Sequence, residues 1–400
     1  MSVARLTTRA AAVVKIESMR SATACSALLA VLLLGGCGAG TGHPDPPAPT
    51  TASATAQDDG DGAPADWQAR VDDAVAQAVT DPGVPGFAMA HVGADRELVV
   101  AVAGRRSHDD ATPLAADAPF HLGSDTKAMT AVLLATYVEE GRLDLDARLD
   151  ALFPDAGLAE PTASVTLRDV LGHRAGLDDQ AVLDDTGLMA MLAATDPAEI
   201  REQVALAGLR AAGEPGGFAY SNVGYMVAGV VAERIGGAPW EELVTERVFR
   251  PLGMECGFGA PQGPTDPLGH DAQGTVVAAD SPSADNPAAL GPAGTVHCPM
   301  ASWAAFTTAV LDGLQGRDSP VLTAATVAEL FADDHDYVAG WMRVDDAGRT
   351  VWAHDGSNTL WYARALLDVD RDEVLLMASN TGEQAAVDVM DRLSEEYAAG

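Results

Sequence analysis

Basic residues are scarce in this 400-residue sequence, where 24 Lys and Arg stand against 58 Asp and Glu, giving a formal net charge of −34. A protein that follows a phosphate backbone needs basic patches, so this balance argues against a nucleic-acid partner. Aromatic residues are also few, at 5%, but apolar residues reach 48%. That apolar share suffices for a sizeable core and excludes global disorder.

Several motifs that carry enzyme chemistry are missing. The chain has only four cysteines, with no CxxC pair and no Cys/His cluster that would indicate zinc. It has no P-loop, no HExxH and no GxGxxG after a strand. No serine has glycine at both −2 and +2, which argues against an α/β-hydrolase. We therefore expect neither a metal nor another cofactor.

The N-terminal segment has the composition of an export signal. Four basic residues accompany an apolar run over 27–34, which is too short to span a bilayer as a mature helix. Leu34-Gly35-Gly36-Cys37 then resembles the bacterial lipobox, whose cysteine is diacylated and becomes the mature N-terminus. We predict a lipoprotein signal peptide over 1–36 and a protein secreted across the cytoplasmic membrane and lipid-anchored at its outer face through Cys37. The alternative is an ordinary signal peptide with a stray cysteine.

The segment over 37–65 is rich in Gly, Pro, Ala, Thr and Asp and cannot form a packed core, so it is interpreted as a flexible tether. Cys25 is lost with the signal peptide and Cys37 carries the lipid. Cys256 and Cys298 then remain in an oxidising compartment, where an even pair predicts a disulfide. Two separate buried thiols are the alternative.

The rest of the chain, 66–400, shows no further linker or repeat and is predicted to be one large domain. Apolar spacing predicts a helix that begins near Trp67, a hairpin over 87–92 and 97–103, and a helix over 124–140. Helices and long loops are expected from about 140 to 290. Four strand-like runs and a closing amphipathic helix follow, the runs being 337–344, 349–354, 360–367 and 374–379.

Strands at both ends of the domain with helices between them predict an α+β fold. The expected architecture is one antiparallel sheet from about 66–122 and 290–400, flanked by helices, with a helical lobe over about 123–289. A cleft between the two lobes is the default place for a site.

The first motif, Ser124-Asp125-Thr126-Lys127, opens a predicted helix. Residues three apart share a helical face, so the Ser124 hydroxyl and the Lys127 amine can meet. A hydroxyl nucleophile needs a neighbouring base, and neutral lysine can serve where arginine cannot. The chain has two lysines, Lys15 and Lys127, and Lys15 lies in the signal peptide. To act as base near pH 7, Lys127 must lower its pKa from about 10.4, which requires desolvation or a cationic neighbour.

Two more segments carry polar groups suited to catalysis. In the second motif, Tyr220-Ser221-Asn222, the tyrosine can relay a proton and the asparagine can bind an amide; the simpler interpretation is a turn whose Asn222 caps the next helix. The third motif, His354-Asp355-Gly356-Ser357, ends a predicted strand. Its glycine permits close approach of a substrate, and His354 can donate a hydrogen bond across the cleft. A strand-end histidine beside a turn is the alternative.

In this order, the three motifs resemble those of the β-lactamase/penicillin-binding serine hydrolase family, and in particular its class C-like branch. The segments 165–177, 251–254 and 291–296 are similar to further signatures of that branch. The resemblance covers about residues 66–400 and implies a β-lactamase/transpeptidase-like fold. It also gives His173 a structural place rather than a catalytic one.

The resemblance implies roles for the motif residues. Ser124 is the nucleophile that forms an acyl-enzyme, Lys127 and Tyr220 share proton transfer, and Asn222 orients the substrate. The backbone N–H groups of Ser124 and Ser357 form the oxyanion hole.

The third motif departs from that of the classical β-lactamases, which begins with Lys and continues with Thr or Ser. His354 is mostly neutral at pH 7, and Asp355 beside it is expected to repel anions. His354, Gly356 and Ser357 are the expected substrate-binding residues of this motif, and a substrate carboxylate is not favoured there. We therefore expect an ester, lactone or neutral amide substrate.

A second function class stays open. A non-catalytic or slowly deacylating lipoprotein that binds penicillin or peptidoglycan fragments would have the same motifs. For either function the expected partners are a small-molecule or peptidoglycan-derived substrate and, through the lipid anchor only, the membrane.

Overall fold

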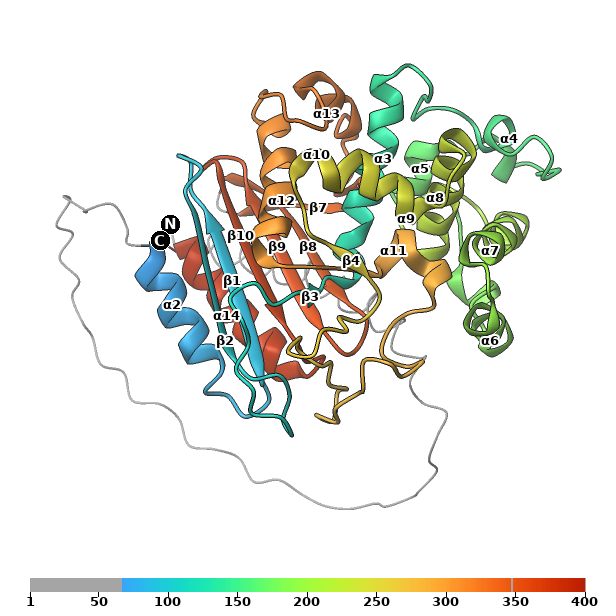
Figure 1. Ribbon diagram of the computed structural model, residues 1–400. Coiled ribbons are helices and arrows are strands. Elements are labelled where there is room, and N and C mark those ends of the chain that lie inside the picture. Colours follow the sequence, from blue (N-terminus) through green and yellow to red (C-terminus); the bar gives the residue numbers. More distant parts are fainter. Residues whose placement is uncertain (1–66, 347, 400) are drawn as a thin grey trace, which may run out of the picture.

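The computed structural model describes residues 67–346 and 348–399 (Figure 1). The predicted signal peptide, the tether and Cys37 lie outside these residues. The centre is a seven-stranded antiparallel sheet in the order β2-β1-β10-β9-β8-β7-β6. Its strands are β1 (Gly86–Val92), β2 (Leu98–Gly104), β6 (Tyr337–Val338), β7 (Trp341–Asp346), β8 (Arg349–Ser357), β9 (Tyr362–Asp368) and β10 (Glu373–Ser379). The α+β fold with its antiparallel sheet is confirmed.

Helices from the two ends of the domain cover one face of the sheet. They are α2 (Trp67–Ala78) and α14 (Gln384–Ala399), and their apolar stripes share a core with the sheet. The other face packs against α12 (Met300–Leu314), which contacts β1 and β10. Burying apolar side chains on both faces explains why the central strands are apolar along their whole length.

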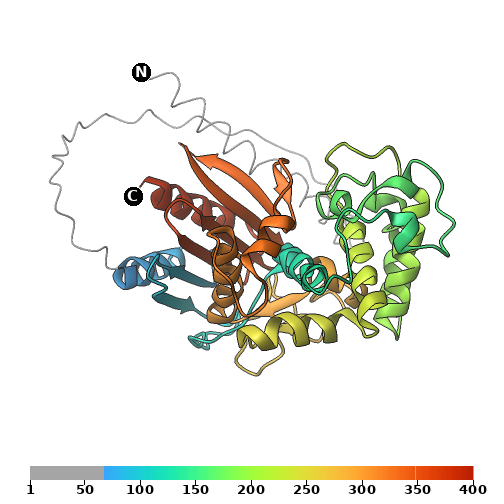
Figure 2. The ribbon, with the colours of Figure 1, turned by 90° about the horizontal axis from the view of Figure 1, so that it is seen from above.

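The helices between residues 140 and 250 stand to one side of the sheet, in green and yellow in Figure 2. Here α8 (Asn222–Gly236) packs against α3 (Thr126–Glu139), and both are buried almost all round. The remaining α-helices of the described domain, inside and outside this range, are α4 (Leu149–Leu152), α5 (Leu167–Leu171), α6 (Asp185–Ala193), α7 (Pro197–Ala211), α9 (Trp240–Val244), α10 (Arg250–Leu252), α11 (Gly291–Gly294) and α13 (Ala324–Leu330).

A second, three-stranded sheet in the order β3-β5-β4 connects these parts. It comprises β3 (Phe120–His121), β4 (Gly257–Phe258) and β5 (Val296–Cys298). The predicted disulfide is present, because Cys256 is bonded to Cys298 and thereby joins the start of β4 to the end of β5.

Two predicted elements differ from the structure. The strand expected over 337–344 is divided into β6 and β7, because Ala339 and Gly340 have φ of 51° and 88°. Gly340 permits a close approach to α3, since a Cβ there would lie 2.5 Å from the backbone N of Ala128. The strand expected to end at residue 354 continues to Ser357, so the third motif lies within β8 and not in a turn.

Candidate active site

Ser124 and Lys127 meet as their spacing predicts. Ser124 lies in the 3₁₀ turn η2 (Gly123–Asp125), and Lys127 lies in the first turn of α3. The Lys127 Nζ is 3.0 Å from the Ser124 Oγ, 2.9 Å from the Asn222 Oδ1 and 2.6 Å from the carbonyl oxygen of Ala293. Lys127 is 0% exposed, whereas Ser124 is partly exposed. The hydroxyl is therefore open to a substrate while the amine lies behind it.

Burial gives Lys127 the base strength that the sequence requires. It lowers the pKa of Lys127 to about 7, against the charges of Asp179 and Asp125, which raise it. Of the two causes considered from the sequence, desolvation is the one at work. Near neutral pH a large fraction of this side chain is an uncharged amine that can accept the Ser124 proton.

Tyr220 and Asn222 complete the surroundings of the amine. The Lys127 Nζ lies 4.8 Å from the centre of the Tyr220 ring. Burial raises the pKa of Tyr220, although a hydrogen bond with Ser124 opposes the rise, so the phenol keeps its proton and serves as a donor or relay. The helix-capping interpretation of Asn222 is wrong, because Ser221 is the N-cap of α8 and accepts from the backbone N–H of Gly224.

Asp179 is a site residue that the sequence did not reveal. It lies in the 3₁₀ turn η4 (Asp179–Ala181) and accepts three hydrogen bonds, from the Ser221 hydroxyl at 2.6 Å and from the backbone N–H of Asn222 at 2.8 Å and Val223 at 3.0 Å. A carboxylate is favourable at the N-terminus of a helix. Asp179 thus fixes the start of α8, which carries the second motif.

His173 has the structural place that the resemblance implies. Its Nδ1 accepts from the backbone N–H of Ser221 at 3.1 Å, and its ring centre lies 4.3 Å from that of Tyr220. Burial lowers the pKa of His173 well below its ordinary value, so the ring is neutral. His173 thus supports the second motif through its contacts with Ser221 and Tyr220.

The structure corrects the expectation for His354. The side chain is 1% exposed, and its Nε2 lies 3.1 Å from the hydroxyl oxygen of Tyr337, so it does not reach across the cleft. Burial and the nearby Lys127 lower the pKa of His354 to about 3, which keeps the imidazole uncharged.

The expectation that Asp355 repels anions is also wrong. Successive side chains of β8 point to opposite faces of the sheet, and Asp355 points away from His354 toward β9 and α14. Arg364 contacts the two Asp355 oxygens at 2.6 and 2.8 Å, and the Tyr362 hydroxyl donates to the carboxylate at 2.7 Å. Arg364 holds the pKa of Asp355 below its ordinary value despite burial, so the negative charge is neutralised locally.

Glycines bring the nucleophile turn against β8. A Cβ on Gly123 would lie 2.3 Å from the backbone N of Ser357, and one on Gly356 would lie 1.9 Å from the carbonyl oxygen of Leu122. The close approach expected at Gly356 is thus made by the η2 turn. The η2 turn, which carries Ser124, therefore lies directly against Ser357. The oxyanion hole that the resemblance implies for the backbone amides of these two residues stays a prediction. The Ser357 hydroxyl itself donates to the carbonyl oxygen of Trp361 at 2.7 Å.

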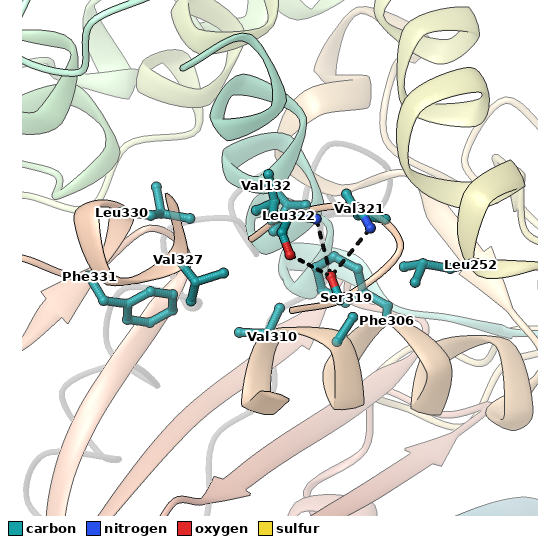
Figure 3. Close-up of a pocket in the computed structure, with 11 residues that line it drawn as sticks. Val132, Leu252, Phe306, Val310, Ser319, Val321, Leu322, Val327, Leu330 and Phe331 are labelled. Atoms are coloured by element: carbon teal, nitrogen blue, oxygen red, sulfur yellow. Dashed lines mark hydrogen bonds between the residues drawn. The ribbon is translucent and has the colours of Figure 1, made fainter. Parts of the chain in front are cut away.

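An apolar cavity elsewhere in the molecule carries no comparable chemistry (Figure 3). It lies between α3, α12 and α13 and is lined by side chains such as Val132, Phe306, Val310 and Val327. Its single hydroxyl, that of Ser319, is hydrogen-bonded to the backbone of Val321 and Leu322. Within residues 67–346 and 348–399, no group of three or more His, Cys, Asp or Glu side chains is placed to hold a metal ion.

The fold and the Ser–Lys pair define a serine hydrolase, and the comparisons with known proteins agree. Residues 71–399 match the family model described as Beta-lactamase, so the chain belongs to the β-lactamase family. Penicillin-binding protein 4 of Amycolatopsis lactamdurans is 28% identical over 74% of this chain and 79% of its own length. Esterase EstB of Burkholderia gladioli is 31% identical over 48% of this chain and 52% of its own.

Solved structures have the same fold. The D-amino acid amidase from Ochrobactrum anthropi SV3, complexed with L-phenylalanine amide, has a TM-score of 0.65 and 22% identity, and the match covers 83% of this chain and 98% of that one. The octameric penicillin-binding protein homologue from Pyrococcus abyssi has a TM-score of 0.64 and 19% identity, covering 78% and 73%. At this identity the likeness supports the fold alone.

Proposed function

We propose that this serine hydrolase cleaves esters, lactones or neutral amides through an acyl-enzyme on Ser124. The observation that carries the proposal is the Lys127 amine, whose pKa is lowered to about 7 and which lies 3.0 Å from the Ser124 hydroxyl oxygen. The uncharged amine takes the hydroxyl proton as Oγ bonds to the substrate carbonyl carbon. The tetrahedral intermediate collapses, and the departing alcohol or amine receives a proton through Lys127 and Tyr220. Water then releases the acid and restores Ser124.

The remaining site groups hold the substrate. The backbone N–H groups of Ser124 and Ser357 receive the developing oxyanion. The Asn222 Oδ1 is occupied by Lys127, which leaves the amide NH₂ to bind a substrate carbonyl.

The third motif favours an uncharged substrate. His354 is buried and neutral, and Asp355 is paired with Arg364, so neither a cation nor a free anion faces the site from these positions. A permanent cation would be needed to hold a substrate carboxylate firmly. Esterase EstB among the relatives supports an ester substrate.

A substrate panel tests the proposal. A chromogenic ester, a D-amino acid amide and a cephalosporin would be offered to the wild type and to Ser124→Ala. We expect ester cleavage to be the strongest activity and Ser124→Ala to lose all of them. Penicillin turnover comparable with that of a dedicated β-lactamase would contradict the substrate class. A fluorophosphonate that never labels Ser124 would contradict the enzyme, and labelling without any turnover would favour the slowly deacylating binding protein.

We also propose that the protein is exported and lipid-anchored through Cys37 at the outer face of the membrane. The basic and apolar N-terminal segments and the lipobox-like Cys37 support this location, as does the Cys256–Cys298 disulfide, which is typical of oxidising compartments. In the part of the chain that the structure describes, no helix is both long and apolar enough to cross a bilayer. Incorporation of a labelled fatty acid tests the anchor: Cys37→Ser should lose the label, and an unlabelled wild type would contradict the proposal.

A further inference from the structure

Asp125, one residue after the nucleophile, is a buried acid that the proposed reaction does not use. It is 2% exposed, and among the described residues neither of its carboxyl oxygens has a hydrogen-bond partner. A charged carboxylate without a partner is costly to bury. The Asp125 Oδ1 lies 3.5 Å from the Nδ1 of His354, and this ring nitrogen also lacks a hydrogen-bond partner within the described part of the chain. A single proton between the Asp125 Oδ1 and the His354 Nδ1 would therefore give each of these atoms a hydrogen-bond partner.

Polar groups beyond His354 determine where that proton belongs. Tyr225 donates its hydroxyl proton to the carbonyl oxygen of Leu171 at 3.0 Å, so toward Tyr337 the Tyr225 oxygen can only accept. A Tyr337 proton directed at Tyr225 leaves the Tyr337 oxygen to accept from the His354 Nε2, 3.1 Å away. A neutral imidazole with its proton on Nε2 has none on Nδ1. The donor to Nδ1 must then be a protonated Asp125.

The charges that face Asp125 agree with this assignment. Burial and the negative charge of Asp355 on β8 raise the pKa of Asp125 well above its ordinary value, while Lys127 on α3 and Arg364 on β9 oppose the rise. Arg364 is already bound to Asp355 through two nitrogens, and His354 is neutral. A protonated Asp125 also spares Lys127 a negative charge two residues away, which would otherwise raise the pKa of the amine.

The Tyr337 ring packs against a proposed reacting group, Tyr220. The Tyr337 ring stands edge-on to Tyr220, with the ring centres 6.3 Å apart and an angle of 86° between the planes. It also packs against His173 at 4.6 Å, and His173 in turn holds Ser221. The position of the Tyr337 ring therefore determines part of the surface against which the Tyr220 ring packs.

We propose that Asp125 is a positioning residue that keeps its carboxyl proton, donates it to His354 and, through His354 and Tyr337, holds Tyr220 in place for proton transfer. The inference rests on the proposed function of Ser124 and Lys127. It assigns the third-motif histidine to the support of the proton relay rather than to the substrate.

Three substitutions test the chain: Asp125→Leu removes the donor with little change of shape, Asp125→Asn replaces it by an amide donor, and Tyr337→Phe removes the hydroxyl but keeps the ring. With a chromogenic ester, we expect Asp125→Leu to lower kcat about 10- to 100-fold with little change in KM, because a misplaced relay affects the transition state more than binding. Asp125→Asn should recover kcat to within about threefold of the wild type, since its N–H can serve His354. The melting temperature of Asp125→Leu should not fall.

The double variant Asp125→Leu/Tyr337→Phe shows whether Asp125 and Tyr337 act on Tyr220 through one another or independently. Residues that act through one another give a combined loss close to the larger single loss. Multiplied losses, a wild-type kcat in Asp125→Leu, or an Asp125→Asn variant as slow as Asp125→Leu would each overturn the inference. So would a clear shift of the acid limb of the pH–rate profile to lower pH in Asp125→Asn, because it would mean that the wild-type carboxyl is charged. If Asp125→Leu fails to fold, Tyr337→Phe decides the matter: we expect it to lower kcat with little change in KM, and a wild-type kcat in Tyr337→Phe would overturn the inference. Ester activity that survives in Ser124→Ala would instead contradict the proposed function.

Discussion

The Lys127 amine lies 3.0 Å from the Ser124 hydroxyl and is fully buried, although the hydroxyl itself is partly exposed. Because the amine lies deeper than the hydroxyl, a substrate can reach the nucleophile while the base stays out of contact with water. The chain has a net charge of −34, and a field of that sign favours the protonated amine. Local desolvation nevertheless dominates, because distant surface charges are screened by salt whereas a buried amine has lost its water.

Replacing Lys127 by Arg tests whether the amine is the base. Arginine stays charged at any relevant pH and cannot accept the Ser124 proton. We expect Lys127→Arg to lower kcat/KM for esters at least about 1000-fold, in the upper range for the loss of a positioned base. A chromogenic ester assay measures the loss, and circular dichroism checks the fold. Activity within tenfold of the wild type would assign the proton transfer to another group.

The pH dependence follows from the same amine. Since the pKa of Lys127 is lowered to about 7, kcat/KM should fall as the pH drops below 7 and the amine becomes protonated. Asp179 raises this pKa, so Asp179→Asn should move the acid limb to lower pH. Rates measured from pH 5 to 9 on both proteins check the direction.

A matched control separates charge from helix capping. Asp179 also accepts from Ser221 and from two backbone N–H groups, so its loss will lower kcat as well. Ser221→Ala removes the hydroxyl hydrogen bond to Asp179 and leaves the charge in place. It should reduce kcat without moving the limb, and an unmoved limb in Asp179→Asn would contradict the electrostatic link to Lys127.

Local spacing could predict the central pair of this site. Ser124 and Lys127 are three residues apart, and the apolar helical run that follows them is enough to place both at one helix start. Short apolar runs bounded by turns likewise predicted the strands at both ends of the domain. These features depend on neighbours along the chain, which a single sequence displays directly.

Features that depend on distant partners could not be predicted. Asp179 lies 42 residues before Ser221, and no local pattern links the two. The position of Asp355 has a different cause: the apolar run predicts a strand that ends at residue 354, whereas β8 continues to Ser357 and its alternation turns Asp355 toward Arg364. The role of Asp125 depends on a histidine from the other end of the domain, which only the assembled sheet brings within 3.5 Å.

The buried pair of Asp355 and Arg364 should dominate the stability of β8 and β9. Removing one partner leaves an unpaired buried charge, so we expect Arg364→Met to lower the free energy of unfolding by about 3–5 kcal/mol. Urea denaturation measures it. Asp355→Leu combined with Arg364→Met should lose less, because Asp391, which also loses its contact with Arg364, is partly exposed and no fully buried charge is left unpaired. A single variant as stable as the wild type would contradict this view of the pair.

The same pair contributes a pH dependence of known sign. The pKa of Asp355 is lower in the folded protein than its ordinary value near 3.9. Its stabilising effect is therefore complete above pH 4 and is lost as the pH falls through the folded value. Urea titrations at pH 7 and pH 3 should show a smaller difference between wild type and Arg364→Met at the acidic end.

Gly123 lies at a close contact between the nucleophile turn and β8. It has φ of 51°, and a Cβ there would lie 2.3 Å from the backbone N of Ser357, so Gly123→Ala must push the turn and the strand apart. Separating the two amides of the oxyanion hole should cost about 100- to 1000-fold in kcat. Gly141 supplies the matched control, because it has φ of 67° and a Cβ there would meet nothing within 4 Å. Gly141→Ala should lose about 1 kcal/mol of stability and keep its kcat. Equal kcat values for the two alanine variants would show that the contact between Gly123 and Ser357 does not form the oxyanion hole.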